Sequence, residues 1–177
     1  MYKLVIGLAN PGRKYQNARH NLGSVLINRY AQKHSIKLSN KTNLQAKVGQ
    51  IRVGESKIIL AIPTTYMNMS GQSVYKLANF YKISPENIYI AHDDLDIGVG
   101  ESKIQFGRGP AGHNGIKSII ENLGTQEFWR IRIGTDHPQD NVSEEDYVLK
   151  PPTKEEKGKI DQTIDKIVNQ LNQTLGL

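Results

Sequence analysis

The sequence predicts a single-domain α/β protein, in which a mixed, twisted β-sheet lies between two layers of helices (a three-layer α/β/α arrangement). A length of 177 residues suits one domain with an ample core, so we expect one domain over residues 1–177. Segments typical of strands alternate along the chain with segments of helical periodicity. Two neighbouring strand segments look like a hairpin, so antiparallel pairs are expected beside parallel ones.

The amino-terminal part of the chain is predicted to hold a strand, a helix and a hairpin. A strand is expected over residues 2–8, and apolar residues close to helical spacing predict a helix over residues 22–33. Strands over residues 46–53 and 57–62 flank Gly54-Glu55, which is typical of a hairpin. The segment between the first strand and the first helix is long enough to form an active-site loop.

The middle of the chain continues with a helix and two strands. Apolar residues at positions i, i+3, i+4 and i+7 predict a helix over residues 70–81. A strand over residues 87–91 follows and leads into an acidic cluster that includes Asp93. A short strand over residues 103–106 then precedes a glycine-rich turn over residues 107–112.

The next segment is predicted to be a helix and a strand. Asn114 is a candidate cap for the helix, and Gly124 is its expected end. Residues 128–133 alternate as a strand, which places Arg130 and Arg132 on the face opposite the apolar side chains.

The end of the chain is predicted to be a surface loop and a long helix. Residues 136–143 look like a loop and not like a domain linker. Thr153 and Glu156 have the spacing of a capping box. The apolar face of the helix that they begin consists of Ile160, Ile164, Ile167, Val168 and Leu171.

Composition and charge narrow the classes of function. A formal net charge of +6 and a pI of about 9.4 favour a polyanionic partner, although many basic proteins bind no nucleic acid. The chain has no cysteine, which excludes disulfides, thiolate metal sites and a cysteine nucleophile. No apolar run approaches the roughly 18 to 20 residues of a membrane span, and the first residues do not form a signal peptide. We therefore expect a soluble, cytoplasmic protein with no membrane partner.

Three groups of polar motifs follow or adjoin predicted strands. Loops at the carboxyl ends of strands in open α/β sheets collect ligand-binding side chains. The motifs are Gly7-Leu8-Ala9-Asn10-Pro11-Gly12 with Ala18-Arg19-His20-Asn21, Tyr66-Met67-Asn68-Met69-Ser70-Gly71, and His92-Asp93-Asp94-Leu95-Asp96 with Gly112-His113-Asn114-Gly115. We expect the side chains that share one cleft to include Asn10, His20, Asn68, Asp93 and Asn114.

The residue types in these motifs favour attack by an activated water. The sequence has no Gly-x-Ser-x-Gly elbow, no Walker phosphate loop and no His-Glu-x-x-His motif. His20 is the best candidate base, because a neutral imidazole can accept a proton from water. Asp93 is its natural partner, since a carboxylate on the other ring nitrogen fixes the tautomer and stabilises the imidazolium. Clustered carboxamides suit recognition of a peptide-like backbone and of a developing oxyanion.

Simpler interpretations of the same residues remain open. The cluster of Asp93, Asp94 and Asp96 could be a solvated acidic turn or a divalent-metal site. Asparagines in such motifs are most often turn or cap residues, and Tyr66 and Met67 are more often core residues than pocket walls. The glycine-rich turn could be a plain connection or could present backbone N–H groups to an anion.

Taken together, the motifs resemble the bacterial-type peptidyl-tRNA hydrolase family. The family pattern is Gly-Leu-(Gly/Ala)-Asn-Pro-Gly, Tyr and Arg-His-Asn, then Pro-x-Thr-(Tyr/Phe)-Met-Asn-x-Ser-Gly, then Asp-Asp/Glu-Leu-Asp, Gly-Gly-His-Asn-Gly and Arg-(Leu/Ile)-Arg-Ile-Gly. The match runs from Leu4 to about Leu149. The resemblance implies a monomeric mixed-sheet fold and hydrolysis of the ester that joins a peptide to the 3′-terminal ribose of tRNA.

The resemblance also implies roles for individual residues. His20 would be the general base, Asp93 its orienting carboxylate, and Asn10 a positioner of the scissile group or of the water. No metal or organic cofactor is implied, and tRNA is the implied partner. The implied substrate contacts are Tyr15 at the tRNA site, Asn68 and Asn114 on the peptide with Tyr66 and Met67 beside them, and Lys103 and Arg132 on phosphates.

The chain departs from the family pattern at a few positions. Gln105 stands where a second lysine is frequent, Ala111 replaces a usual glycine, Ala18 replaces a frequent threonine, and Thr135-Asp136 replaces Ile-Gly. We expect these changes to affect tRNA affinity more than the chemistry. Two rival functions are a non-catalytic RNA-binding module on the same fold and a hydrolase that holds a metal on the acidic cluster.

Overall fold

The computed structural model describes residues 1–139 and 141–177. Its strands form one seven-stranded sheet in the order β2-β3-β4-β1-β5-β7-β6. β1 pairs in parallel with β4 and β5, and β5 pairs in parallel with β7, whereas the pairs that involve β2, β3 or β6 are antiparallel. The strands are β1 (Tyr2–Gly7), β2 (Ser39–Lys41), β3 (Ala46–Val53), β4 (Ser56–Pro63), β5 (Ile88–Asp94), β6 (Ser102–Phe106) and β7 (Trp129–Gly134).

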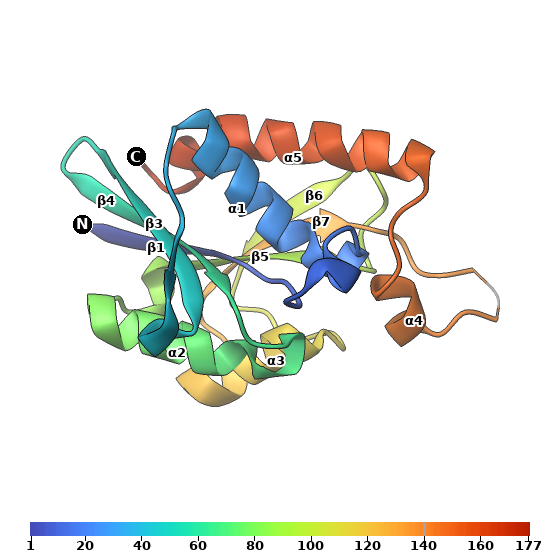
Figure 1. Cartoon of the computed structure of the whole chain (residues 1–177), viewed down its shortest axis with the longest axis horizontal. Coiled ribbons are helices and arrows are strands. Elements are labelled where there is room, and N and C mark those ends of the chain that lie inside the picture. The colour runs from blue at the N-terminus through green and yellow to red at the C-terminus, as the bar shows by residue number, and fades with distance from the viewer. Residues whose placement is uncertain (140) are drawn as a thin grey trace.

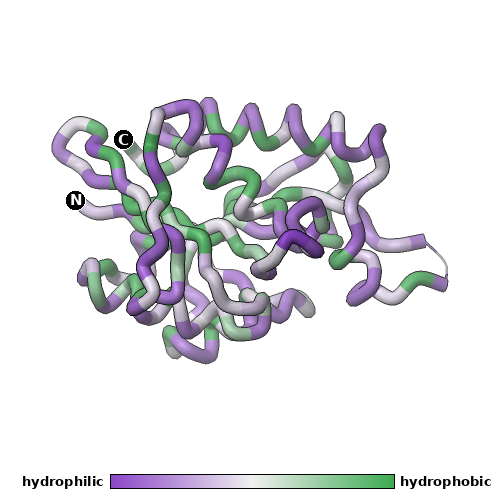
Figure 2. Tube along the Cα trace, in the orientation of Figure 1, coloured by the Kyte–Doolittle hydropathy of each residue, from purple (hydrophilic) through white to green (hydrophobic). Residues whose placement is uncertain are grey.

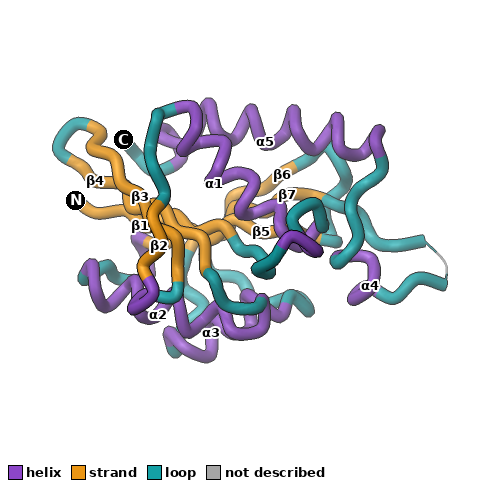
Figure 3. The backbone as a smooth tube through the Cα atoms, viewed as in Figure 1, coloured by secondary structure: helices purple, strands orange, loops and turns teal. Residues whose placement is uncertain are grey.

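Helices cover both faces of this sheet (Figure 1). α1 and α5 pack on one face, α2 and α3 pack on the other, and the short α4 lies beyond the end of the sheet; Figure 3 shows the same layers by type of structure. The helices are α1 (Leu22–Lys33), α2 (Ser70–Tyr81), α3 (Asn114–Leu123), α4 (Glu144–Val148) and α5 (Lys154–Thr174). Among the described residues, no helix is both long and apolar enough to cross a membrane.

Each face of the sheet has its own hydrophobic core. Val5 faces the core that α1 and α5 close, whereas Leu4 and Ile6 face the core that α2 and α3 close. This split follows from the alternation of side chains along a strand. Figure 2 shows hydrophobic residues concentrated in the central strands and alternating with hydrophilic ones along α5. The predicted three-layer α/β/α class with a mixed sheet is confirmed.

Most predicted elements are present, and the differences have local causes. β5 runs to Asp94 and not only to residue 91, so Asp93 lies inside the strand end. β2 and α4 were not predicted. β2 is three exposed polar residues at a sheet edge and shows no alternation, while α4 is too short for a helical period. The loop predicted over residues 136–143 includes residue 140, which lies outside the described residues.

The amino-terminal cap of α3 differs from the prediction, whereas that of α5 agrees with it. Asn114 is not the cap of α3, because it is already the first helical residue. The cap is His113, whose Nδ1 accepts hydrogen bonds from the backbone N–H groups of Gly115 and Ile116 at 3.2 and 3.3 Å. The capping box of Thr153 and Glu156 is present at the start of α5.

Two glycines let α1 approach the sheet closely. A Cβ atom on Gly7 would lie 2.1 Å from the carbonyl oxygen of Gly23, and a Cβ atom on Gly23 would lie 2.1 Å from that of Ala91. Neither position has room for a side chain. The start of α1 therefore sits directly on the carboxyl ends of β1 and β5, which brings the turn before α1 to Asp93.

Candidate active site

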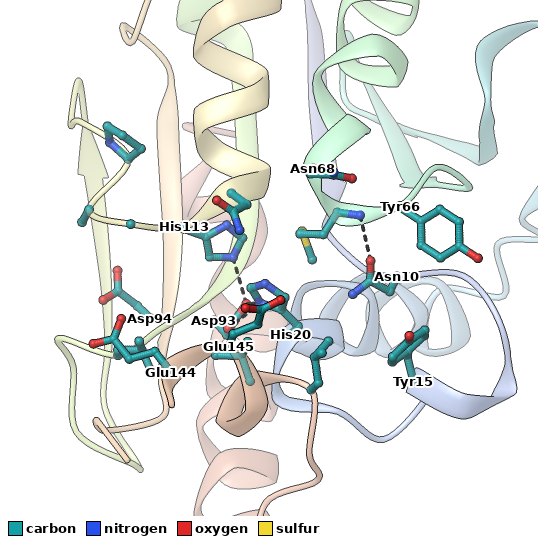
Figure 4. A pocket seen from close by; sticks show the side chains of 18 of the residues that line it. Asn10, Tyr15, His20, Tyr66, Asn68, Asp93, Asp94, His113, Glu144 and Glu145 are labelled. Atoms are coloured by element: carbon teal, nitrogen blue, oxygen red, sulfur yellow. Dashed lines mark hydrogen bonds and ion pairs between the residues drawn. The ribbon is translucent and has the colours of Figure 1, made fainter. Parts of the chain in front are cut away.

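A cavity of about 690 Å³ opens at the carboxyl ends of β1 and β5. This end of the sheet lies opposite the tip of the β3–β4 hairpin. Its walls come from the loop after β1, the turn before α2, the end of β5, the glycine-rich turn before α3, and α4 (Figure 4). This cavity is lined by every residue that was predicted to be catalytic or substrate-binding, apart from the two expected to meet tRNA phosphates. These residues are Asn10, Tyr15, His20, Tyr66, Met67, Asn68, Asp93 and Asn114.

His20 and Asp93 are in direct contact at the floor of this cavity. His20 belongs to the short 3₁₀ turn η2 (Arg19–Asn21), and its Nδ1 lies 2.9 and 2.8 Å from the two carboxylate oxygens of Asp93. Both side chains are buried. Because a carboxylate only accepts hydrogen bonds, His20 carries its proton on Nδ1 and keeps the lone pair of Nε2 for another partner.

The same contact sets the charge of both groups. Burial lowers the pKa of His20, but the charge of Asp93 and its hydrogen bond outweigh that effect, so the pKa of His20 is raised overall. Burial alone would raise the pKa of Asp93, yet the charges and hydrogen bonds of His20 and His113 hold it well below its usual range. Asp93 is therefore ionised wherever His20 titrates.

His113 is a second partner of Asp93 that sequence reasoning did not assign. Its Nε2 lies 3.0 Å from Asp93 Oδ1, while its Nδ1 accepts the two backbone N–H groups at the start of α3. The proton of His113 is therefore on Nε2 and points at Asp93. The signal in the sequence was the motif that carries His113 beside Asn114, but the tautomer depends on the fold of the turn.

His92 lies behind this pair and does not face the cavity. Its Nδ1 donates to the backbone carbonyl of Asp93 at 2.7 Å, and its ring packs edge-on against the ring of His113. Burial, together with the neighbouring His113, lowers the pKa of His92 to about 3. His92 is thus a neutral support for Asp93.

Asn10 is held in place from two sides. Its backbone N–H and C=O both bond the side chain of Asn21, at 2.8 and 2.9 Å, and its Oδ1 accepts the backbone N–H of Met67 at 2.7 Å. Since its oxygen is occupied, the Asn10 side chain offers its N–H₂ group to the cavity. Tyr66 and Asn68 lie on the wall next to Asn10 (Figure 4). Asn114 follows His113 in the chain and also lines the cavity.

The carboxylates of the acidic cluster separate toward different partners. Asp94 forms an ion pair with Arg132 at 2.8 Å, and Asp96 lies 2.8 Å from the Nε2 of the exposed His137. The metal site considered on Asp93, Asp94 and Asp96 therefore has no common centre. Among the described residues, a different set, His20, Asp93 and His113, places one ligand atom each within 4.8 Å of the others. The three side chains lie close together because both histidines form N–H···carboxylate hydrogen bonds with Asp93, so their proximity does not by itself indicate a metal site.

Comparison with known proteins decides the family. The sequence model of the family described as peptidyl-tRNA hydrolase matches residues 4–176. The chain belongs to this family. Relatives named peptidyl-tRNA hydrolase include one from Actinobacillus pleuropneumoniae, 44% identical over 93% of this chain and 85% of the relative. Another, from Nitrosomonas europaea, is 44% identical over 92% of this chain and 84% of the relative.

Solved peptidyl-tRNA hydrolase structures have the same fold. The enzyme from Acinetobacter baumannii superposes with a TM-score of 0.90 and 36% identity, over 98% of this chain and 89% of that one. A peptidyl-tRNA hydrolase in complex with N-propanol superposes with a TM-score of 0.94 and 35% identity, over 99% of this chain and 89% of the other.

Two departures of this chain from the peptidyl-tRNA hydrolase pattern have visible structural consequences. Ala111 adopts a φ of 47°, so an alanine takes up the left-handed backbone that suits glycine in the turn that lines the cavity. At Gln105, where the resemblance leads one to expect a lysine, Oε1 accepts a hydrogen bond from Arg132 at 2.9 Å.

The two residues predicted to meet tRNA phosphates differ in accessibility. Lys103 is exposed on the edge strand β6, whereas the paired Arg132 on β7 is buried and held by Asp94 and Gln105. Neither residue lines the cavity. As a free cation for phosphate, Lys103 is thus better placed than Arg132.

Sequence reasoning also missed the wall that α4 supplies. Glu144, Glu145, Val148 and Leu149 line the cavity, but nothing in a helix of five residues indicates from sequence that it folds back over the site. The Arg19 side chain contacts the end of this helix through the backbone carbonyl oxygen of Tyr147 at 3.2 Å.

Proposed function

We propose that this chain hydrolyses the ester bond between the peptide and the 3′-terminal ribose of peptidyl-tRNA, using a water molecule that His20 activates. Membership of the peptidyl-tRNA hydrolase family supports the reaction. The observation that carries the residue roles is the hydrogen bond from His20 Nδ1 to Asp93, because it leaves Nε2 as a base. The described lining of the cavity contains no serine, threonine, cysteine or lysine that could serve as a nucleophile.

In this proposal His20 moves one proton through the whole reaction. The water oxygen attacks the ester carbonyl carbon while its proton passes to Nε2 of His20. Asp93 stabilises the imidazolium that forms. The tetrahedral intermediate then collapses, the carbon–oxygen bond to the ribose breaks, and His20 returns the proton to the departing ribose oxygen. The products are tRNA with a free hydroxyl and a peptide carboxylic acid, which releases its remaining water-derived proton to solvent and becomes a carboxylate.

The carboxamides have complementary roles in the proposal. The Asn10 N–H₂ group is a donor for the developing oxyanion or for the water, since its own oxygen is held by Met67 N–H. Asn68 and Asn114 can donate to and accept from the peptide backbone, with Tyr66 and Met67 forming the wall. We place Tyr15 at the terminal nucleotide.

The rival functions make different predictions. A non-catalytic RNA-binding module is not supported by relatives that carry the name of an enzyme. A metal-dependent hydrolase would lose activity on thorough chelation, whereas our proposal expects activity to be retained.

We further propose that residues 1–177 form one domain that works as a monomer in the cytoplasm. All residues of the proposed site come from one chain and surround one end of one sheet, which supports the monomer. Peptidyl-tRNA arises in translation, which supports the compartment.

The function is tested with a matched pair of substrates. The chain should cleave an N-blocked aminoacyl-tRNA and spare the same aminoacyl-tRNA with a free amino group. Release of the amino acid from both at equal rates would instead indicate a general esterase.

The pH dependence follows from the state of His20. Burial lowers the pKa of His20, but Asp93 raises it by more than burial lowers it. Activity should therefore fall on the acid side through one ionisation above the ordinary imidazole value of about 6.5. Above that pH His20 is neutral and accepts a proton; below it the imidazolium cannot. The measurement is kcat/KM against pH, and the same acid limb in the residual activity of His20→Ala would assign the ionisation elsewhere.

The position of Lys103 predicts a separable effect on tRNA binding. Phosphate contacts act through charge and counterion release, so Lys103→Glu should raise KM several-fold and lower the salt slope by about 0.7 to 0.9 for one lost contact. A short substrate with only the terminal adenosine and acyl group should be little affected. Lys166→Glu makes the same charge change on the exposed face of α5 and serves as the control. Equal KM and salt slope in both variants would exclude Lys103 from the interface.

A further inference from the structure

Arg19 lies between η2, the turn that carries His20, and α4, which forms one wall of the cavity. Its side chain is buried, with its guanidinium carbon 3.8 Å from the centre of the Tyr147 ring. Nη1 lies 3.1 to 3.2 Å from three backbone carbonyl oxygens, and Nη2 donates to Glu156 Oε2 at 2.8 Å. The three carbonyl groups belong to Tyr147, Lys150 and Pro151, at the end of α4 and just after it.

The same cluster is tied to two further parts of the fold. Tyr147 Oη donates to the carbonyl oxygen of Thr135, just after β7, at 2.6 Å. The Glu156 carboxylate that Arg19 binds also accepts the Thr153 N–H in the capping box of α5. Arg19 thus joins α4 and the start of α5 to the turn that carries His20.

The catalytic groups themselves have anchors that do not involve Arg19. The His20 ring is held by Asp93, and the end of its turn is held by the paired hydrogen bonds between Asn21 and Asn10. α4, in contrast, is a single short helix in which only Val148 is buried. Besides the Arg19 side chain, the ties of this segment to the rest of the fold include the hydrogen bonds from Tyr147 Oη to Thr135 and from the Arg19 backbone N–H to the Lys150 carbonyl oxygen at 3.1 Å. Loss of the Arg19 guanidinium should therefore loosen α4 more than it displaces the His20 ring.

We infer that Arg19 is a positioning residue that sets the α4 wall of the cavity for the substrate, separately from the chemistry at His20. The inference rests on the proposed function, because the wall matters to KM only if peptidyl-tRNA occupies the cavity. Arginine suits the role because its planar group can bond several carbonyl oxygens and a carboxylate at once, which a lysine ammonium cannot do in the same geometry.

The test is Arg19→Met, which keeps an unbranched apolar stem and removes the guanidinium. We expect KM for a blocked aminoacyl-tRNA to rise about tenfold and kcat to stay within about threefold, since misplacing a positioning element weakens substrate alignment. The acid limb of the pH profile should not move. Amide hydrogen exchange over residues 144–150 should become faster in the absence of substrate. Arg19→Lys should give an intermediate KM.

The chain offers a matched control in Arg29. It ties α1 to α5 through Asp161 and Asp165 at 3.0 Å, as Arg19 ties η2 to the start of α5, but it lies away from the cavity. Arg29→Met should leave KM and the exchange at α4 unchanged. An equal loss in both variants, a parental KM in Arg19→Met, or a fall in kcat with KM unchanged would overturn the inference.

Two further outcomes are separable. If Arg19→Met does not fold, Arg19→Lys decides the question, because the ammonium keeps the charge but cannot bond the same carbonyl oxygens together; a parental KM there would overturn the inference. If the parent chain cleaves no blocked aminoacyl-tRNA, the proposed function fails. The exchange comparison, made without substrate, then still shows whether Arg19 holds α4.

Discussion

Replacement of His20 by alanine is expected to lower kcat by about 10² to 10⁴, which is the usual cost of losing a positioned general base. Among the described cavity residues, His113 is the other histidine, and its Nδ1 is already bound to two backbone N–H groups. No second imidazole is therefore free to take the proton from water. The measurement is the single-turnover rate on a blocked aminoacyl-tRNA at saturating enzyme.

The fold should survive this change, because His20 packs at the floor of an open cavity and not inside either hydrophobic core. A thermal melt of the variant is the control. A folded His20→Ala variant that hydrolysed the substrate at the parental rate would rule out His20 as the base.

Asp93→Asn is expected to have the second-largest effect, a fall in kcat of about 10². The carboxylate accepts an N–H from both His20 and His113. A carboxamide has one oxygen and would turn its N–H₂ group toward one of the rings, which disfavours the tautomer of His20 that keeps Nε2 free. The loss is smaller than for His20→Ala because the ring itself remains.

The same variant has a second signature in its pH profile. Asp93 raises the pKa of His20 against the effect of burial, so its neutralisation should shift the acid limb of kcat/KM to lower pH. Asp96→Asn is the matched control, since Asp96 also contacts a histidine, His137, but lies outside the cavity. A parental acid limb in Asp93→Asn, with His20 still required, would contradict the pairing.

The elements that could be predicted from sequence are those with a full period of buried residues. α1, α2 and β3 have the predicted bounds because each buries a regular set of apolar side chains. β2 and α4 are too short to show any period. Their positions depend on contacts with distant residues, such as those of Arg19 with the end of α4.

The candidate site shows the same limit. Asn10, His20 and Asp93 could be grouped because their motifs follow or adjoin predicted strands and because a base needs a carboxylate partner. His113 could not be assigned, since its role depends on which nitrogen accepts the backbone N–H groups of α3. Arg132 alternates with apolar residues as predicted, but its burial follows from Asp94 and Gln105 on the neighbouring strands.

The proposed mechanism depends on the protonation state of His20, which nitrogen-15 NMR measures directly. We predict that Nδ1 of His20 stays protonated across the titration, and that Nε2 titrates at the pH of the acid limb of kcat/KM on blocked aminoacyl-tRNA. A His20 ring with its neutral-state proton on Nε2, or a titration of Nε2 at a different pH from the kinetic limb, would contradict the assignment of His20 as the base that activates water.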